Sequence, residues 1–260
     1  MGNGAALDNG ARVLATIGRL AVRWSRPLVG SPKTVTISRE ADGWYAGFSC
    51  AAVPTQPLPL TGRATGIEVG RQVWLVTAAG AAGAAVAHPR HHRRAEKRLA
   101  QAQRRVARRK QGSKRRDNAQ RLLAKQHQQV QRQRCDFPHQ TALSLLRAAD
   151  VLSRDDLRVA HLVRNRHLAT SISDAGGAQL RTLLSCKAAW AGKRVVVVEP
   201  ASPSHDCRGC GARVEKRLSV RTPVCRSCGR VLDRDQNAAR NSLWAGQARQ
   251  GAGAVAAALN

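Results

Sequence analysis

The sequence lacks the long apolar run that a membrane-spanning helix requires. No stretch of about 18 consecutive apolar residues occurs. The first segment, Met1–Trp24, mixes Gly, Asp and Arg throughout, unlike the apolar centre of a secretory signal. Gly2 follows Met1, but Ala6 stands where a myristoylation motif has Ser or Thr. We therefore expect a cytoplasmic protein that makes no contact with a membrane.

Acidic residues are also scarce. The chain of 260 residues has 16 Asp and Glu against 44 Lys and Arg, so its formal net charge is +28. A field of this sign and size attracts polyanions. Nucleic acid is therefore the expected partner.

The cysteines do not have the distribution of a disulfide framework. Their number, seven, is odd, and four of them form two C-x-x-C pairs. This arrangement is typical of metal binding in a reducing compartment. Cys50, Cys135 and Cys186 stand alone, and we expect them to be buried as small apolar side chains.

The two C-x-x-C pairs predict one structural zinc ion. They are separated by 14 residues, and a glycine follows each pair at once: Cys207, Cys210, Cys225 and Cys228. Each pair forms a tight turn that directs two thiolates at one point, and the glycine lets the chain fold back. Four thiolates leave zinc no open position for a substrate. The alternative is that these thiols are unrelated.

The first part of the chain predicts a small β module over residues 1–60. Three segments rich in β-branched or aromatic residues are expected to be strands: 18–24, 33–39 and 43–50. Asp42-Gly43 has the composition of a hairpin turn. The proline-rich segment 53–63 predicts a linker to the main domain.

Residues 61–260 predict an α/β domain. Segments 64–70 and 72–78 are expected to be adjacent strands joined through Gly70, and 78–87 is a weak strand or a loop. Segment 141–157 indicates a helix that runs into a strand. A further helix over 178–192, capped by Ser173 or Asp174 and closed by Gly192, precedes the valine-rich segment 193–200, a fully buried parallel strand. Alternating strands and helices define the α/β class.

Residues 88–134 form a strongly basic segment, with 17 Lys or Arg against two acids. We expect a helical hairpin, broken near Gly112-Ser113. A solvated helical face or partial disorder is the alternative. Because so many cations repel one another unless phosphates neutralise them, the density favours a nucleic-acid groove. The candidate contacts lie around the break: Arg104, Arg105, Arg108, Arg109, Lys110, Lys114, Arg115 and Arg116.

Three acids, Glu68, Asp155 and Asp235, lie in or beside apolar segments. A carboxylate among buried strand residues is costly unless it is paired or binds a metal. Carboxylates gathered in one cleft would bind Mg²⁺, and two such ions can activate water and stabilise the leaving oxygen of a phosphodiester. Taken singly, each acid also fits an exposed strand end or a helix cap.

Several segments together resemble a known family. "VRNRHLATSISDAG", "AAWAGKRVVVVEP", the two C-x-x-C-G segments and "DRDQNAARN" are similar to the TnpB (OrfB) proteins of insertion sequences, RNA-guided endonucleases related to type V CRISPR effectors. The likeness runs from about Gly18 to Gln250, and its most specific part is Arg164 to Asn241.

The resemblance implies a RuvC-like nuclease domain of ribonuclease H fold over residues 61–260. It also implies a zinc ribbon at 205–230, inserted before the last catalytic segment, and a partial wedge-like β-barrel before the domain. The basic hairpin would lie along guide RNA and target DNA, so the protein would associate with the bacterial nucleoid. Zn²⁺ would be structural and Mg²⁺ catalytic. No oligomeric state is implied.

The implied catalytic triad departs from the family at two positions. Glu68 stands where the family has Asp, Asp155 stands where it has Glu, and Asp235 is of the expected type. Each exchange moves a carboxylate by one methylene, which predicts impaired cleavage. The family's proteins are also longer, which indicates N-terminal truncation. Three functions therefore stay open: an impaired RNA-guided endonuclease, a guide-directed DNA-binding protein without cleavage, and a decayed transposase fragment.

Overall fold

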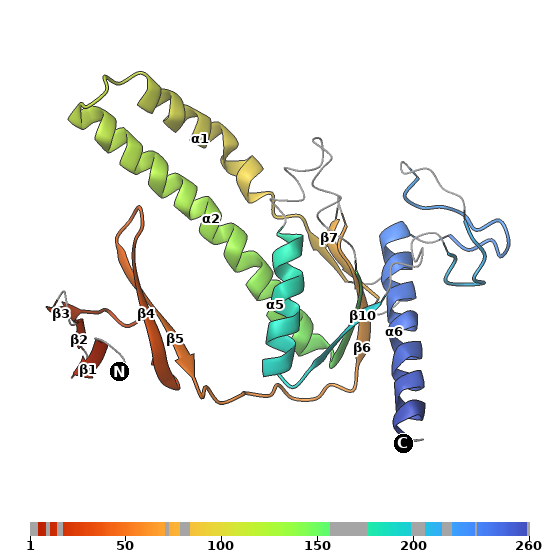
Figure 1. Ribbon diagram of the computed structural model, residues 1–260. Helices are drawn as coiled ribbons and strands as arrows, with labels where there is room; N and C mark the ends of the chain where they lie inside the picture. Colours follow the sequence, from red (N-terminus) through yellow and green to blue (C-terminus); the bar gives the residue numbers. More distant parts are fainter. Residues whose placement is uncertain are drawn as a thin grey trace. The chain divides into compact units, whose positions relative to one another are not determined.

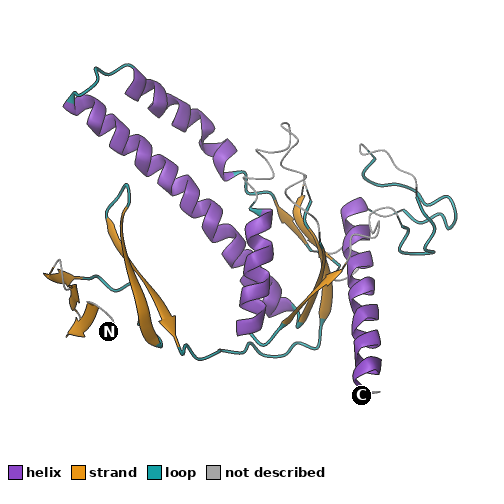
Figure 2. Ribbon diagram, viewed as in Figure 1, coloured by secondary structure: helices purple, strands orange, loops and turns teal. Residues whose placement is uncertain are grey.

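The structure is a computed structural model, whose helices and strands are shown in Figure 2. It falls into two compact units, Met1–Thr55 with Ala102–Gln128 and Gln56–Gln101 with Gln129–Asn260. The residues described are 5–8, 11–14, 18–70, 73–78, 84–156, 176–198, 206–214, 220–231 and 233–258, with side chains described between 21 and 250. Among the helices in these ranges, none has the length and apolar character needed to cross a bilayer.

The first unit contains two small antiparallel sheets. One consists of β1 (Ala5–Asp8), β2 (Ala11–Leu14) and β3 (Gly18–Ala21), and the other is the hairpin of β4 (Ser31–Arg39) and β5 (Trp44–Ala51). The amide of Glu40 donates to the carbonyl oxygen of Gly43 at 2.8 Å, which closes the hairpin. The predicted Asp-Gly turn is therefore confirmed, whereas the barrel over 1–60 stays a prediction.

The basic segment forms two helices, α1 (His91–Ala107) and α2 (Lys114–Ala148), with the predicted break between them. Gly112 has a φ of 74°, and Ser113 caps α2 because its Oγ accepts a hydrogen bond from the Arg116 amide at 3.2 Å. However, α2 does not end at residue 134. It continues for 35 residues in all because its last turns carry apolar side chains that pack in the core of the second unit.

The second unit is built on a five-stranded mixed sheet in the order β10-β9-β6-β7-β8. Its strands are β6 (Ala64–Glu68), β7 (Val73–Thr77), β8 (Ala85–Ala87), β9 (Val151–Asp155) and β10 (Arg194–Val198). The strands β6, β9 and β10 are parallel, and β7 and β8 are antiparallel to their neighbours. The predicted α/β class is confirmed, and β6 and β7 are adjacent as expected.

Helices cover both faces of this sheet (Figure 1). The end of α2 and α5 (Gly177–Trp190) lie on one face, and α6 (Arg234–Ala258) lies on the other. The apolar core lies under α2 and α5 and is formed by these buried residues: Ile67, Trp74, Leu75, Ala142, Leu145, Leu146, Ala149, Leu152, Leu180, Leu184 and Ala188. Glu68 and Asp155, the last residues of β6 and β9, are not part of this core.

Three sequence-based expectations are wrong in detail. The valine-rich strand β10 is not fully buried, because among the described strands it is an edge strand that pairs with β9 alone. Helix α5 starts after Gly176, which has a φ of 63° and no side chain to cap the helix, while Ser173 and Asp174 lie outside the described residues. Cys135 and Cys186 are exposed and Cys50 is half-buried, so none of the three is buried as expected.

The other end of α5 follows the prediction. Gly192 has a φ of 65°, and the amide of Lys193 donates to the carbonyl oxygen of Ala188 at 2.9 Å. This is the hydrogen bond of a Schellman motif, which needs glycine at the left-handed position. Of the segment 78–87, the part 85–87 is strand β8, and 79–83 lie outside the described residues.

Helix α6 packs unusually close to β6 because Gly66 has no side chain. A Cβ at this position would lie 1.9 Å from the carbonyl oxygen of Ala239 and 2.7 Å from the amide nitrogen of Leu243.

We predict that Gly66→Ala lowers the free energy of unfolding by about 3 kcal/mol, the upper range for overpacking. Urea denaturation measures this. Gly43→Ala, where the Cβ would meet open space, is the control and should change stability little. Equal stability of the two variants would contradict the packing described.

Candidate functional site: three carboxylates beside a four-cysteine cluster

The alternation of side chains along the strands directs two acids toward α6. Gly66 and Ser153 are register partners on β6 and β9, and both lie against α6. Because side chains two residues apart share a face of a sheet, Glu68 and Asp155 lie on this same face. Each is the last residue of its strand. The two acids therefore stand side by side at the carboxyl edge of the sheet.

Asp235 is brought to the same edge by the start of α6. Asp233 caps this helix, because its Oδ1 accepts hydrogen bonds from the amides of Asp235 at 2.9 Å and Gln236 at 3.2 Å. Asp235 lies in the first turn and is 8% exposed. A Cβ on Gly70, two residues after Glu68, would lie only 3.0 Å from Asp235 Oδ2. The structure thus brings the three predicted acids together.

The pKa of Glu68 is raised in part by the two neighbouring carboxylates. Burial, followed by the charges of Asp155 and Asp235, raises the pKa of Glu68 from 4.5 to about 8, against a smaller lowering by Arg234. Its Oε2 is buried and has no hydrogen-bond partner within the described part of the chain. A buried carboxylate oxygen without a donor is suited to a cation.

The raised pKa of Glu68 predicts that the free energy of unfolding depends on pH when no divalent cation is bound to the carboxylates. Glu68 binds its proton more tightly in the folded than in the unfolded state. The stabilisation of the fold that this provides is complete below about pH 4.5 and is lost as the pH rises through about 8. We expect Glu68→Gln to remove this loss, leaving the variant more stable than the parent at pH 8.5 by roughly 3 kcal/mol. Urea titrations of the zinc-loaded chain without added Mg²⁺, at pH 5 and 8.5, measure the difference. A stability gap that is the same at both pH values would contradict it.

The four cysteines of the two C-x-x-C pairs form a single cluster. Their sulfur atoms all lie within 4.8 Å of one another, and the pairs Cys207–Cys228 and Cys210–Cys225 each have a sulfur separation of 3.6 Å. Four sulfurs at a bond length of about 2.3 Å around a tetrahedral ion are about 3.8 Å apart. The cluster therefore could hold a metal ion. Among the described residues, the carboxylates are not gathered this tightly.

Both pairs have the same backbone geometry. The amide of Gly211 donates to the carbonyl oxygen of Cys207, and that of Gly229 to Cys225, each at 2.8 Å. The two glycines have φ angles of 74° and 69°, a conformation that side chains disfavour, so the predicted role of glycine is confirmed. Backbone amides of Cys228 and Ser227 lower the pKa of Cys225 to about 6. The backbone amide of Ala212 lowers the pKa of Cys210, but hydrogen bonds with the thiols of Cys225 and Cys228 raise it to about 12, so within this contact pair only Cys225 favours the thiolate that a metal requires.

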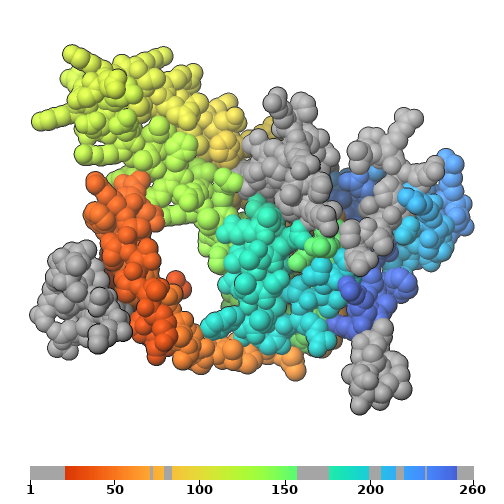
Figure 3. Space-filling view, in the orientation of Figure 1, coloured from red at the N-terminus to blue at the C-terminus, as the bar shows by residue number. Residues whose placement is uncertain are grey.

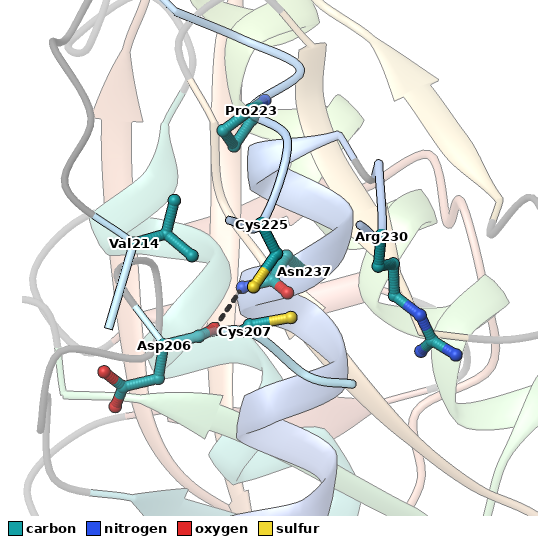
Figure 4. Close-up of a pocket in the computed structure, with 7 residues that line it drawn as sticks. All are labelled: Asp206, Cys207, Val214, Pro223, Cys225, Arg230 and Asn237. Atoms are coloured by element: carbon teal, nitrogen blue, oxygen red, sulfur yellow. Dashed lines mark hydrogen bonds between the residues drawn. The ribbon is translucent and has the colours of Figure 1, made fainter. Parts of the chain in front are cut away.

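Two asparagines of α6 attach the first cysteine pair to the helix. Asn237 donates to the carbonyl oxygen of Asp206 at 2.7 Å and accepts from the amide of Arg208 at 3.0 Å, as Figure 4 shows in part. Asn241 donates to the same carbonyl oxygen at 2.9 Å. Both lie in the segment "DRDQNAARN", and no role was predicted for them from the sequence. Their spacing of four places them on one helix face, which was the available signal.

Seven of the eight candidate cations around the turn between α1 and α2 are exposed. This turn lies at the surface of its unit (Figure 3). Arg116 differs, because its guanidinium is half-buried and donates to the carbonyl oxygens of Val106 at 3.3 Å and Arg109 at 3.1 Å. It therefore closes the end of α1 rather than presenting its charge freely.

Two known sequence families match parts of the chain. Residues 48–166 match the OrfB family described as "Probable transposase", and residues 178–242 match the "Cas12f1-like, TNB domain". The two matches cover both the sheet and the four-cysteine cluster. The chain is similar to these families over these residues.

Two curated relatives and one solved structure are similar to the chain. A "Putative RNA-guided DNA endonuclease" of Streptomyces pristinaespiralis is 42% identical over 94% of this chain and 61% of its own length. The "Putative RNA-guided DNA endonuclease InsQ" of Escherichia coli K12 is 27% identical over 93% and 63%. The chain thus spans about three fifths of these relatives. A cryo-EM structure of a CRISPR-Cas12f ternary complex shares the fold, with a TM-score of 0.52 and 14% identity over 80% of this chain and 44% of its own.

Proposed function

We propose that the chain is the nuclease part of an RNA-guided DNA endonuclease that hydrolyses phosphodiester bonds at the carboxyl edge of its sheet. The observation that carries this proposal is the convergence of Glu68, Asp155 and Asp235, with a buried Glu68 oxygen that has no hydrogen-bond donor among the described residues. The match to the OrfB family and the activity in the names of both relatives support it. The order β8-β7-β6-β9-β10, with β7 and β8 antiparallel, supports a RuvC-like ribonuclease H fold.

The three carboxylates fit divalent cations. Carboxylate oxygens are the ligands that Mg²⁺ prefers, and Glu68 Oε2 is without a hydrogen-bond partner among the described residues. Bound Mg²⁺ would activate water and stabilise the leaving oxygen. Glu68 must lose its proton before it can serve as a ligand, and Asp233 fixes the start of α6 and thereby the position of Asp235.

The four cysteines would hold a structural Zn²⁺. Sulfur separations of 3.6 Å suit tetrahedral coordination by four thiolates, which leaves no position for a substrate. Since Asn237 and Asn241 bind the first pair to α6, the ribbon would brace the helix that carries Asp235. Its role in catalysis would be to position this carboxylate.

Guide RNA and target DNA would contact the exposed cations between α1 and α2. We expect Arg108→Gln with Arg109→Gln to weaken DNA binding and to reduce the slope of log K against log salt by about 1 to 2. Binding titrations between about 50 and 200 mM salt measure this. The exposed pair Arg147→Gln with Arg194→Gln is the matched control and should leave the slope unchanged. Equal slopes for the two double variants would contradict the assignment.

Guide-directed DNA binding without cleavage is the second candidate function. It is favoured by the two exchanged acids, since Glu68 is one methylene longer and Asp155 one shorter than their counterparts in the family. A displacement of about 1 Å in a reacting group can lower a rate about a hundredfold. Binding requires none of these carboxylates.

One assay tests both functions. The protein, purified with the RNA that accompanies it, is incubated with DNA complementary to that RNA over a Mg²⁺ series from pH 7 to 9. The endonuclease proposal expects slow nicking that requires Mg²⁺ and is absent from Asp235→Asn. Guided binding without nicking at any pH would favour the second function, and binding indifferent to the guide would contradict both.

A further inference from the structure

Arg221 connects the four-cysteine cluster to the carboxylate site. It lies between the two cysteine pairs, four residues before Cys225. Its Nε donates to Asp233 Oδ2 at 2.9 Å, and its Nη2 donates to Asp235 Oδ2 at 3.3 Å. Its carbonyl oxygen accepts a hydrogen bond from the amide of Arg234 at 2.8 Å, which fixes the backbone of Arg221 against the start of α6.

The guanidinium of Arg221 stands where it would compete with a cation. Asp235 Oδ2, the atom it contacts, is also the Asp235 oxygen nearest to Gly70, two residues after Glu68 at the end of β6, and so lies toward the other acids. A positive charge at this distance opposes a second cation on the same oxygen. Asp235 has a side-chain exposure of 11% and Arg221 of 35%, so water screens the pair only in part.

Arg221 can leave Asp235 without leaving the site. Its contact with Asp233 is the shorter of the two and uses a different nitrogen, so a small rotation of the guanidinium releases Asp235 alone. Arg234 also approaches Asp235, but through Oδ1 and at 3.7 Å. The Oδ2 contact is therefore the one that a metal ion would displace.

We propose that Arg221 is a displaceable counter-ion of Asp235, through which the cysteine ribbon lowers the affinity of the carboxylate site for divalent cations. The inference rests on the proposed function, because it assumes that Asp235 is a metal ligand. It assigns to the ribbon a positioning role that acts on metal loading, in addition to bracing α6. Loss of the positive charge should tighten cation binding even though a native contact is lost.

The test is the affinity for Mn²⁺, read from the electron paramagnetic resonance signal of the free ion, with zinc-loaded full-length chain. Arg221→Gln is expected to bind Mn²⁺ about three- to fivefold more tightly than the parent, the factor that a partly exposed ion pair supplies. Arg221→Met, which is also neutral, should shift the affinity in the same direction. Arg226→Gln removes the same charge from an exposed position of the ribbon and should stay within about twofold of the parent.

Two further measurements separate the possible failures. Zinc content of one ion per chain in each variant shows that the ribbon is intact. Asp235→Asn should lose the Mn²⁺ site. If Asp235→Asn loses it but both neutral variants at Arg221 bind Mn²⁺ no more tightly than the parent, the counter-ion role is wrong and the proposed function stands. If Asp235→Asn binds like the parent, the metal site itself is wrong, and the inference falls with it.

Discussion

Exchanging both altered acids at once, Glu68→Asp with Asp155→Glu, is expected to raise the rate of Mg²⁺-dependent DNA cleavage by about a hundredfold. Glu68 and Asp155 lie at the ends of adjacent parallel strands and face the same helix, so one carboxylate that reaches too far and one that falls short distort a shared site. Glu68→Asp shortens one side chain by a methylene and Asp155→Glu lengthens the other by one, and a misplacement of about 1 Å can cost about a hundredfold in rate. Single-turnover cleavage of guided DNA measures the effect.

The single exchanges serve as controls for this prediction. Either alone should give less than the double variant, because each leaves one carboxylate displaced. The double variant combined with Asp235→Asn should not cleave. If the double variant binds guided DNA and cleaves no faster than the parent, the positions of Glu68 and Asp155 do not limit the reaction.

Removing the metal from the cysteine cluster is expected to have the largest effect on stability. Structural zinc in such sites contributes about 10–16 kcal/mol of binding free energy, which becomes folding free energy. We predict that Cys225→Ser loses zinc and unfolds the ribbon, while the sheet, whose core contains none of these cysteines, stays folded. Zinc content and amide hydrogen exchange at Asn237 and its neighbours measure the two effects.

Cys186→Ser is the matched control, because Cys186 is exposed on α5 and lies outside the cluster. It should retain one zinc ion per chain and normal protection from exchange in the ribbon. A Cys225→Ser variant that still binds one zinc ion tightly would contradict a site formed by four thiolates.

The features predictable from sequence were those set by short-range rules. The break at Gly112, the glycines after each cysteine pair and the closing Gly192 each need a positive φ, which glycine favours. The grouping of Glu68, Asp155 and Asp235 was predicted because the family resemblance implied a catalytic triad at these positions. Local chemistry and this resemblance were sufficient for these elements.

The features that sequence could not give depend on neighbours distant in the chain. A run of four valines is compatible with an edge strand as well as with a central strand. The sequence therefore does not indicate that, among the described strands, β10 pairs with β9 alone. The end of α2 was placed too early because a change from basic to apolar composition does not by itself end a helix. The partners of Arg221 and Asn237, the carboxylate of Asp235 and the carbonyl oxygen of Asp206, cannot be derived from residue spacing.

The central claim is that Glu68, Asp155 and Asp235 together hold a divalent metal ion. An anomalous difference map from a crystal of the full chain grown with Mn²⁺ tests it most directly, with zinc identified separately at its own absorption edge. The account predicts Mn²⁺ density within about 2.3 Å of an oxygen of each of the three carboxylates, and its loss in Asp235→Asn. Crystals with clear zinc density in the ribbon and no Mn²⁺ density among these acids would contradict the account.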